Sequence, residues 1–192
     1  MCHVDCFCGR DGVCDYSIDT TMAGGNGQVA NMFDIEVLED IALHKFNINC
    51  DTAGSGMTVR IHYKTGSYSG FESNSTAWTQ IYSSASVTCE APGSFTPIVL
   101  GSALILSSGN YAFVVYAEDY LEYTDGSIEG SIVASYPPTN PNVILYEGIG
   151  KSGEFDGSIF SPRIWNGRIE VRSVPFNCRF LFDFFSSKIS ML

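Results

Sequence analysis

The cysteines are the residues of this 192-residue chain whose type and spacing most directly suggest chemistry. Four of the seven lie in the stretch CHVDCFCGRDGVC near the start of the chain, namely Cys2, Cys6, Cys8 and Cys14. A cluster of this density can bind a metal ion, form a small disulfide-linked segment or take part in redox chemistry. The choice between these decides the compartment in which the protein is expected to work.

The spacing of these four cysteines favours disulfides. The pattern C-x3-C-x-C-x5-C contains no CxxC pair, which zinc sites and thioredoxin-type redox centres commonly use. His3 could replace one sulfur as a ligand, but the spacing remains poor for a single tetrahedral ion. A metal site and an ill-defined tail stay open as alternatives.

The other three cysteines point in the same direction. Cys50 ends an apparent strand and Cys89 lies in another, so a disulfide between neighbouring strands is expected. The alternative is that both are small buried side chains. Because seven is an odd number, at least one thiol is free or pairs with another chain, and Cys178 is our candidate. Several disulfides predict an oxidising compartment, so we expect an extracellular or cell-surface location.

Composition excludes some partners. The net charge is −11 with only ten Lys and Arg residues, and they form no basic cluster, which disfavours nucleic-acid binding. No apolar run approaches the roughly 18 residues of a membrane helix, so no membrane span is expected. No signal peptide is recognised before Cys2, so a secreted form would be represented here by a mature chain, a fragment or an incomplete gene sequence.

Motifs for catalysis are absent from the sequence. The histidines His3, His44 and His62 accompany no hydrolase or metalloprotease signature, and we predict that the protein is not an enzyme. His62 is expected on the solvated face of a strand. An acidic segment, AEDYLEYTDGSIEG, is interpreted as a loop with weak candidate ligands for calcium, the one cofactor considered. These ligands are Glu118, Asp119, Glu122 and Asp125.

Aromatic side chains and a glycosylation motif complete the candidates. Loop aromatics could stack on sugar rings or contact a partner protein, although they could equally fold back over the ends of the domain. These aromatics are Tyr68, Phe71, Tyr120, Tyr123 and Trp165. The single acceptor sequence for N-glycosylation is Asn74-Ser75-Thr76, in a polar segment.

Period-2 alternation of apolar and polar residues predicts the elements that carry these groups. It is clearest over 31–38 and 57–64, where Met57, Val59, Ile61 and Tyr63 are expected to face inward. Similar short runs recur between Gly-rich and Pro-rich turns, without helical periodicity. They cover residues 41–50, 78–82, 86–90, 96–106, 110–117, 131–135, 142–147 and 167–173.

The predicted fold is therefore all-β: a two-sheet antiparallel β-sandwich, jelly-roll-like, with about nine or ten strands. A small disulfide-rich segment (1–20) precedes the sandwich domain (21–175), and an apolar tail (176–192) follows it. After Cys14 the polar, Gly-rich stretch is interpreted as a linker and a loop.

Two stretches resemble known modules. CFCGRDGVC resembles the C-terminal half of an EGF-like module, with its last spacing one residue shorter. Residues 22–172 resemble a secreted β-sandwich module of bacterial and algal surface proteins, through GGNGQVANMFDIEVL, HYKTGSYSGFE, SSGNYAFVVY, FSPR and WNG. The second resemblance implies a building unit of extracellular proteins and supplies no catalytic residues. Within it, Asn166-Gly167 matches a type I′ hairpin turn, and Arg163 is expected to pair with a carboxylate such as Asp34.

The C-terminal tail suggests assembly. Phe180, Phe182 and Phe184 recur at strand spacing, and the segment could cover its own core, be donated to a neighbouring molecule or be an artefact of translation past the natural end. Our leading hypothesis is an extracellular structural or adhesive protein that binds itself, filaments included, or other extracellular proteins through its terminal segments. The alternative is a carbohydrate-binding module that uses the loop aromatics and could depend on calcium.

Overall fold

The structure is a computed structural model that describes residues 7–8, 14–138 and 141–173. Within these residues it contains thirteen strands and one short 3-10 helix. The strands are β1 (Phe7–Cys8), β2 (Cys14–Asp19), β3 (Asn26–Val37), β4 (Ile41–Asn49), β5 (Gly54–Thr65), β6 (Thr79–Cys89), β7 (Phe95–Leu106), β8 (Gly109–Asp125), β9 (Ile132–Tyr136), β10 (Val143–Tyr146), β11 (Gly148–Lys151), β12 (Ile159–Trp165) and β13 (Gly167–Ser173). The helix is η1 (Ser75–Ala77).

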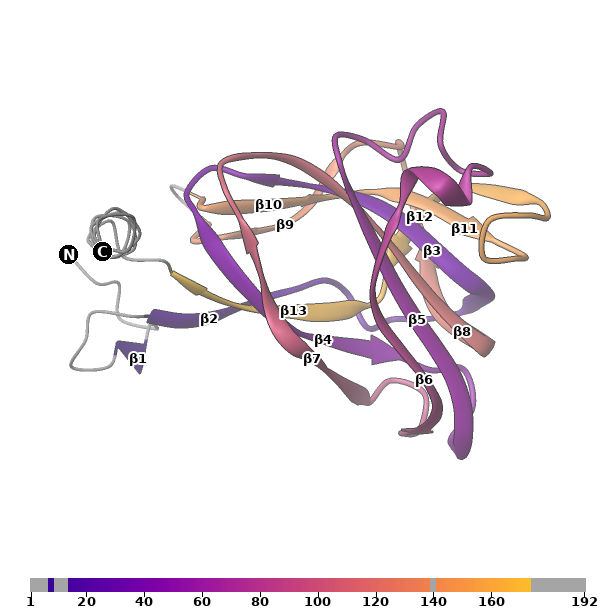
Figure 1. The fold of residues 1–192 in the computed structure, drawn as a ribbon. Helices are drawn as coiled ribbons and strands as arrows, with labels where there is room; N and C mark the ends of the chain where they lie inside the picture. Colours follow the sequence, from indigo (N-terminus) through magenta and orange to yellow (C-terminus); the bar gives the residue numbers. More distant parts are fainter. Residues whose placement is uncertain (1–6, 9–13, 139–140, 174–192) are drawn as a thin grey trace, which may run out of the picture.

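The strands form two antiparallel sheets packed face to face (Figure 1). The five-stranded sheet has the order β1-β2-β13-β4-β7, and the eight-stranded sheet has the order β6-β5-β8-β12-β11-β3-β10-β9, with a further pairing of β8 with β3. No helix in the described part of the chain has the length and apolar character needed to span a bilayer.

Eight of the strands have jelly-roll topology. These strands are β2 to β8 and β13. In one sheet the order is β2-β13-β4-β7, which are the first, eighth, third and sixth of the eight along the chain. In the other sheet β3, β8, β5 and β6 lie side by side, and these are the second, seventh, fourth and fifth. This arrangement confirms the predicted fold class. The strand count exceeds the nine or ten expected because β9–β12 are inserted between the last two jelly-roll strands.

The core between the sheets follows the predicted alternation. Met57, Val59 and Ile61 of β5 are buried, while the residues between them face outward. At the centre, the Trp165 ring stacks on Phe33, with ring centroids 4.7 Å apart, and meets Phe46 edge-on. Each fully buried large apolar side chain contributes roughly 1.5–3 kcal/mol to folding.

The sandwich begins earlier than predicted. Residues 14–19, interpreted as a linker, form β2, which pairs along its length with β13. Tyr16 and Ile18 of this strand are buried in the core, but polar residues surround them, so the apolar alternation is too short to stand out in the sequence. Cys8 and Cys14 lie opposite each other in the β1–β2 backbone pairing. Cys2, Cys6, Cys178, Phe180, Phe182 and Phe184 lie outside the described residues.

Asn166-Gly167 is not a hairpin turn, contrary to expectation. The chain passes here from β12 in the eight-stranded sheet to β13 in the five-stranded sheet. The Asn166 side chain stabilises this passage, because its amide nitrogen donates to the Ile164 carbonyl and its oxygen accepts from Gly24 N–H. A Cβ on Gly167 would lie 2.2 Å from the Trp165 ring, so only glycine fits.

Residues 117–125 of the acidic segment interpreted as a loop belong to β8, which continues to Asp125, and residues 126–130 follow the strand. Gln28 pairs with Leu121 and Ala30 with Tyr116, so β8 uses five residue steps where β3 uses two. The extra residues bulge out of the sheet, and Tyr120 adopts a φ of 72°. A bulge of this size inside a strand has the polar composition of a loop, and for this reason the sequence predicts a loop here.

Candidate functional site

A second, smaller core lies on the outer face of the eight-stranded sheet. Ala30 and Met32 of β3, together with Ala112 and Val114 of β8, form its floor. Residues 66–78, here called the covering loop, and residues 152–158, the covering turn, pack over this floor. The apolar side chains that do so are Tyr68, Trp78 and Phe155.

An ion-pair cluster holds the covering turn on β5. Arg60 Nε donates to both Glu154 carboxylate oxygens, at 2.8 and 3.0 Å. His62 Nε2 lies 2.7 Å from the same carboxylate, and its ring contacts Phe155 edge-on. Burial alone raises the pKa of Glu154, but the hydrogen bonds with His62 and Arg60 outweigh burial and lower the pKa to about 2. His62 is therefore a buried partner of Glu154 and not the solvated residue we expected.

The covering loop is held at three further points. Asp34 accepts a hydrogen bond from Tyr68 N–H at 3.0 Å, and burial raises the pKa of Asp34. The Tyr68 hydroxyl donates to Glu129 at 2.6 Å, and burial raises the pKa of Tyr68. The fully buried Lys151 donates to the Glu72 carbonyl at 2.6 Å, and burial lowers the pKa of this lysine. These polar groups are engaged in holding the loop.

The described structure contains a concave region beside the covering loop and another at β2, β4, β9 and β13. A pocket of about 350 Å³ borders the covering loop, and its lining residues are Asp34, Gly66, Ser67, Asn110, Gly130 and Tyr146. A second, of about 620 Å³, is lined by Asp15, Tyr16, Ser17, His44, Tyr136, Arg168, Glu170 and Arg172. The cations of the second are neutralised across strands, since Arg168 pairs with Asp19 and Arg172 with Asp15.

The predicted ligand aromatics divide into two groups. Tyr68, Tyr123 and Trp165 are buried, in line with the alternative that these rings fold back over the domain. Tyr123 packs against Gly150, and Trp165 and Tyr68 belong to the two cores.

Phe71 and Tyr120 are exposed, at 38% and 46%. They lie toward opposite ends of the β5–β8 pairing and do not share a surface. The Phe71 ring contacts Lys64, which pairs with Ala112 near one end. Tyr120 lies beyond Ala117, the last residue of β8 that pairs with β5 at the other end. Two separate rings do not make a sugar-stacking platform.

The candidate calcium ligands are not brought together. Glu118 and Asp119 are exposed on the β8 bulge. Glu122 accepts a hydrogen bond from Asn49. Arg163 pairs with a carboxylate, as expected, but the partner is Asp125, at 3.2 Å, and not Asp34. Across the described residues, no group of three or more His, Cys, Asp or Glu side chains could hold a metal ion.

Every Lys and Arg side chain within the described ranges has an internal partner. Five pair with carboxylates, while Lys64 and Lys151 donate to backbone carbonyls. The five pairs are Lys45–Glu170, Arg60–Glu154, Arg163–Asp125, Arg168–Asp19 and Arg172–Asp15. Carboxylates without a cationic partner, such as Glu118 and Asp119, therefore dominate the charge of the surface.

Two edge strands at one side of the sandwich contain no charged residue. Among the described residues, β6 and β7 are each paired with one neighbour and have no Asp, Glu, Lys or Arg, and we call these two strands the uncharged side. On β7, Val99 is 63% exposed and Ile105 is 60% exposed. The sequence pattern predicts β7 over 96–106, but it predicts two short strands, 78–82 and 86–90, where the structure has the single strand β6. It does not show that these strands lie at the edges of the two sheets.

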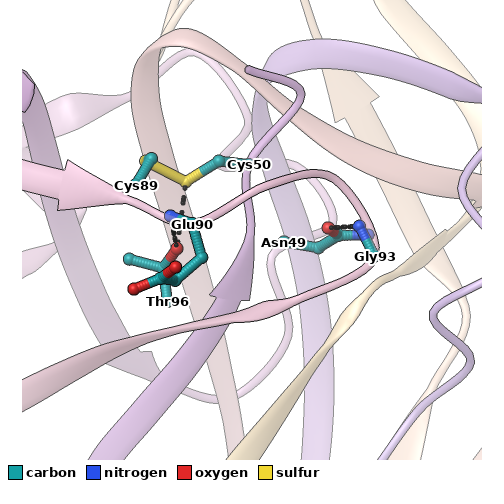
Figure 2. Close-up of a disulfide and its surroundings, with 6 residues drawn as sticks. All are labelled: Asn49, Cys50, Cys89, Glu90, Gly93 and Thr96. Carbon is teal, nitrogen blue, oxygen red and sulfur yellow. Dashed lines mark hydrogen bonds between the residues drawn. A yellow bond between two sulfur atoms is a disulfide. The ribbon is translucent and has the colours of Figure 1, made fainter. Parts of the chain in front are cut away.

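The predicted disulfide braces this side. Cys50 and Cys89 are joined, with their Cα atoms 6.0 Å apart, where β6 ends (Figure 2). The turn that follows is fixed at both ends, because Glu90 N–H donates to Thr96 Oγ1 and Gly93 N–H donates to Asn49 Oδ1, each at 2.8 Å. β6 and β7 therefore keep a fixed relative position although they belong to different sheets.

The backbone of the β7 edge is blunted. Pro97 has no N–H to offer, and β7 bulges between Val99 and Leu104, which pair with Lys45 and Leu43 of β4. Proline and bulges are two of the devices by which natural sheets prevent open-ended strand addition. Contacts at this edge must therefore come from side chains.

Comparisons with known proteins concern the fold alone. No family model and no curated protein matches the chain. Among solved structures, the infectious bursal disease virus VP2 subviral particle is similar at 9% identity over 84% of this chain, with a TM-score of 0.24. The structure of the Gt strain of the same virus is similar at 7% identity over 83%, with a TM-score of 0.22. The chain spans 39% and 38% of those chains, and likenesses this weak carry no functional argument.

Proposed function

We propose that this protein is an extracellular structural building block whose copies associate along the uncharged side. The observation that carries this proposal is the pair of edge strands β6 and β7, which have no charged residue and expose Val99 and Ile105. In a chain of net charge −11, edge strands without charged residues let two copies approach with little electrostatic repulsion.

The contact is made by side chains. Pro97 and the β7 bulge oppose continuous backbone pairing, so apolar side chains such as Val99 and Ile105 supply the attraction. When the same surface patch on two copies makes the contact, the result is a two-fold symmetric dimer to which no third copy can be added through that patch. Filaments, the form of assembly that the sequence suggested, then need a second contact, and the terminal segments remain our candidates for it.

The extracellular location is part of the proposal. The Cys50–Cys89 disulfide supports it, because protein disulfides persist in oxidising compartments and are rare in the cytosol. Non-reducing mass spectrometry of the native protein tests this point. Recovery of both thiols in reduced form would overturn it.

The test of association is a charge placed on the uncharged side. We expect the double substitution Val99→Glu, Ile105→Glu to weaken dimerisation by roughly tenfold or more in analytical ultracentrifugation, because it sets like charges against each other. The matched control is Ile128→Glu, Ile159→Glu, at residues that are 69% and 50% exposed elsewhere. The proposal is overturned if the wild-type protein stays monomeric at high concentration. It is also overturned if the control variant dimerises as weakly as the test variant.

Carbohydrate binding is the second candidate function. It is supported by the 350 Å³ pocket, whose lining includes a carboxylate (Asp34), an amide (Asn110) and a tyrosine (Tyr146). Hydroxyl-rich ligands are bound by such groups. A glycan array probed with the wild type and Asn110→Ala, with and without EDTA, tests this candidate and its calcium dependence. Binding that Asn110→Ala leaves unchanged would count against this pocket.

A further inference from the structure

The glycosylation motif lies on an ordered, exposed turn of the covering loop. Asn74, Ser75 and Thr76 are all exposed, at the start of η1. Thr76 Oγ1 donates to Asn74 Oδ1 at 2.7 Å, so the hydroxyl and the amide that define the motif are in contact. Among the described residues, Asn74 Nδ2 has no hydrogen-bond partner.

The fold leaves this amide dispensable. The turn is held by other contacts, since Trp78 Nε1 donates to the Phe71 carbonyl at 3.1 Å and Trp78 is buried in the outer-face core. A sugar on Nδ2 therefore displaces no contact in the described structure. Exposure of the acceptor and a turn that does not depend on it are the two conditions for a glycan that the folded protein tolerates.

We propose that Asn74 is an N-glycosylation site of this protein; this inference rests on the proposed extracellular location. The donor class is an oligosaccharide linked to a lipid diphosphate. The amide nitrogen forms a bond to the anomeric carbon, the bond from that carbon to phosphate breaks, and the lipid diphosphate leaves as the amide loses one proton.

The position of the glycan leaves the uncharged side usable. The covering loop packs on the outer face of the eight-stranded sheet, whereas β7 belongs to the five-stranded sheet. Asn74 lies five residues before Thr79, where β6 begins, so the sugar stands beside the start of β6, on the sheet that does not contain Val99 and Ile105. The modified face is thus not the face proposed for self-association.

The test is translation of the full chain, carrying a cleavable signal sequence, in the presence of eukaryotic microsomes. A second acceptor tripeptide appended to the C-terminus reports that each molecule reached the lumen. We expect two glycans, both removed by an endoglycosidase, and one glycan in Asn74→Gln and Thr76→Ala. Ser75→Ala is the matched control within the motif and should keep both glycans.

Modification of the appended acceptor alone overturns the inference, because the lumen was reached and Asn74 was not used. Two glycans that persist in Asn74→Gln overturn it as well. Failure of the proposed self-association appears separately, as a monomer in ultracentrifugation whether or not Asn74 is glycosylated. We expect enzymatic removal of the glycan to leave the dimerisation constant unchanged within about twofold.

Discussion

Glu154 shows how one side chain fixes an entire segment. It lies on a turn between two short strands and receives hydrogen bonds from Arg60 and a contact from His62, both on β5. The pair stands at the edge of the outer-face core, partly exposed to solvent, where ion pairs contribute more than on an open surface. Removing the carboxylate should release the covering turn.

We expect Glu154→Gln to destabilise the protein by about 1.5 kcal/mol at pH 7, after allowance for solvent screening. The pKa of Glu154 is lowered to about 2 in the folded state from an ordinary value of 4.5, so its stabilisation is present above pH 4.5. As the pH falls from 4.5 towards 2 that stabilisation is lost, and the two proteins should converge. Urea unfolding across this pH range measures the difference.

Glu118→Gln is the control for this prediction. It removes the same charge from an exposed position on the β8 bulge, and we expect its effect to remain within about 0.5 kcal/mol. An effect of Glu118→Gln as large as that of Glu154→Gln would show that net charge, and not the Arg60 and His62 contacts, is responsible.

At the scale of single elements, the passage from β12 to β13 is the most constrained segment. Gly167 lies between the Trp165 ring and the Asn47 carbonyl, which a Cβ would approach to 2.2 and 2.5 Å. We expect Gly167→Ala to destabilise the protein by about 3 kcal/mol, because the core must shift to admit the methyl group. Gly101→Ala is the matched control, since a Cβ there meets nothing within 4 Å. Thermal unfolding of both variants distinguishes crowding from a general effect of losing glycine.

The Cys50–Cys89 disulfide is the second element-scale feature with a measurable effect. It closes a segment with a sequence separation of 39, for which chain entropy predicts a stabilisation of roughly 4 kcal/mol. The double variant Cys50→Ala, Cys89→Ala should therefore unfold at lower denaturant concentration, while far-UV circular dichroism still reports a β-protein. Equal midpoints for the variant and the oxidised wild type would contradict this expectation.

Sequence patterns predicted the elements where one period holds throughout. The alternation of Met57, Val59 and Ile61 identified β5 and its buried face. The same reasoning failed at Tyr120, because a bulge changes the period within one strand, and at Asn166-Gly167, because a turn motif does not specify which sheet comes next. It also could not pair His62 with Glu154, since only the tertiary fold brings residues 92 positions apart into contact.

For the whole molecule, the distribution of charge is the basis of the proposed association between copies. The chain carries a net charge of −11, and the cations in its described part are engaged internally. Composition revealed this net charge, but the existence of an uncharged side depends on which strands lie at the sheet edges. The candidate association surface was therefore beyond sequence reasoning, whereas the fold class was within it.

We expect self-association to strengthen with salt. Screening shortens the range of repulsion between copies from tens of ångströms at about 10 mM to about 4 Å at 0.5 M salt, while apolar contacts at Val99 and Ile105 persist. Sedimentation equilibrium at low and high sodium chloride measures the change in the dimerisation constant. A constant that falls with salt would indicate an interface built on ion pairs and would contradict the uncharged side.

The pairing of β2 with β13 has a mechanical consequence. Asp15 lies opposite Arg172 and Asp19 opposite Arg168, so the two ends of the sandwich leave from the same place. Tension applied at residues 14 and 173 pulls across this strand pair and breaks its hydrogen bonds one after another, starting at Arg172, instead of loading them together in shear. A fibre whose units were linked through these ends would stretch at low force, and units joined through β6 and β7 would carry the load outside this weak seam.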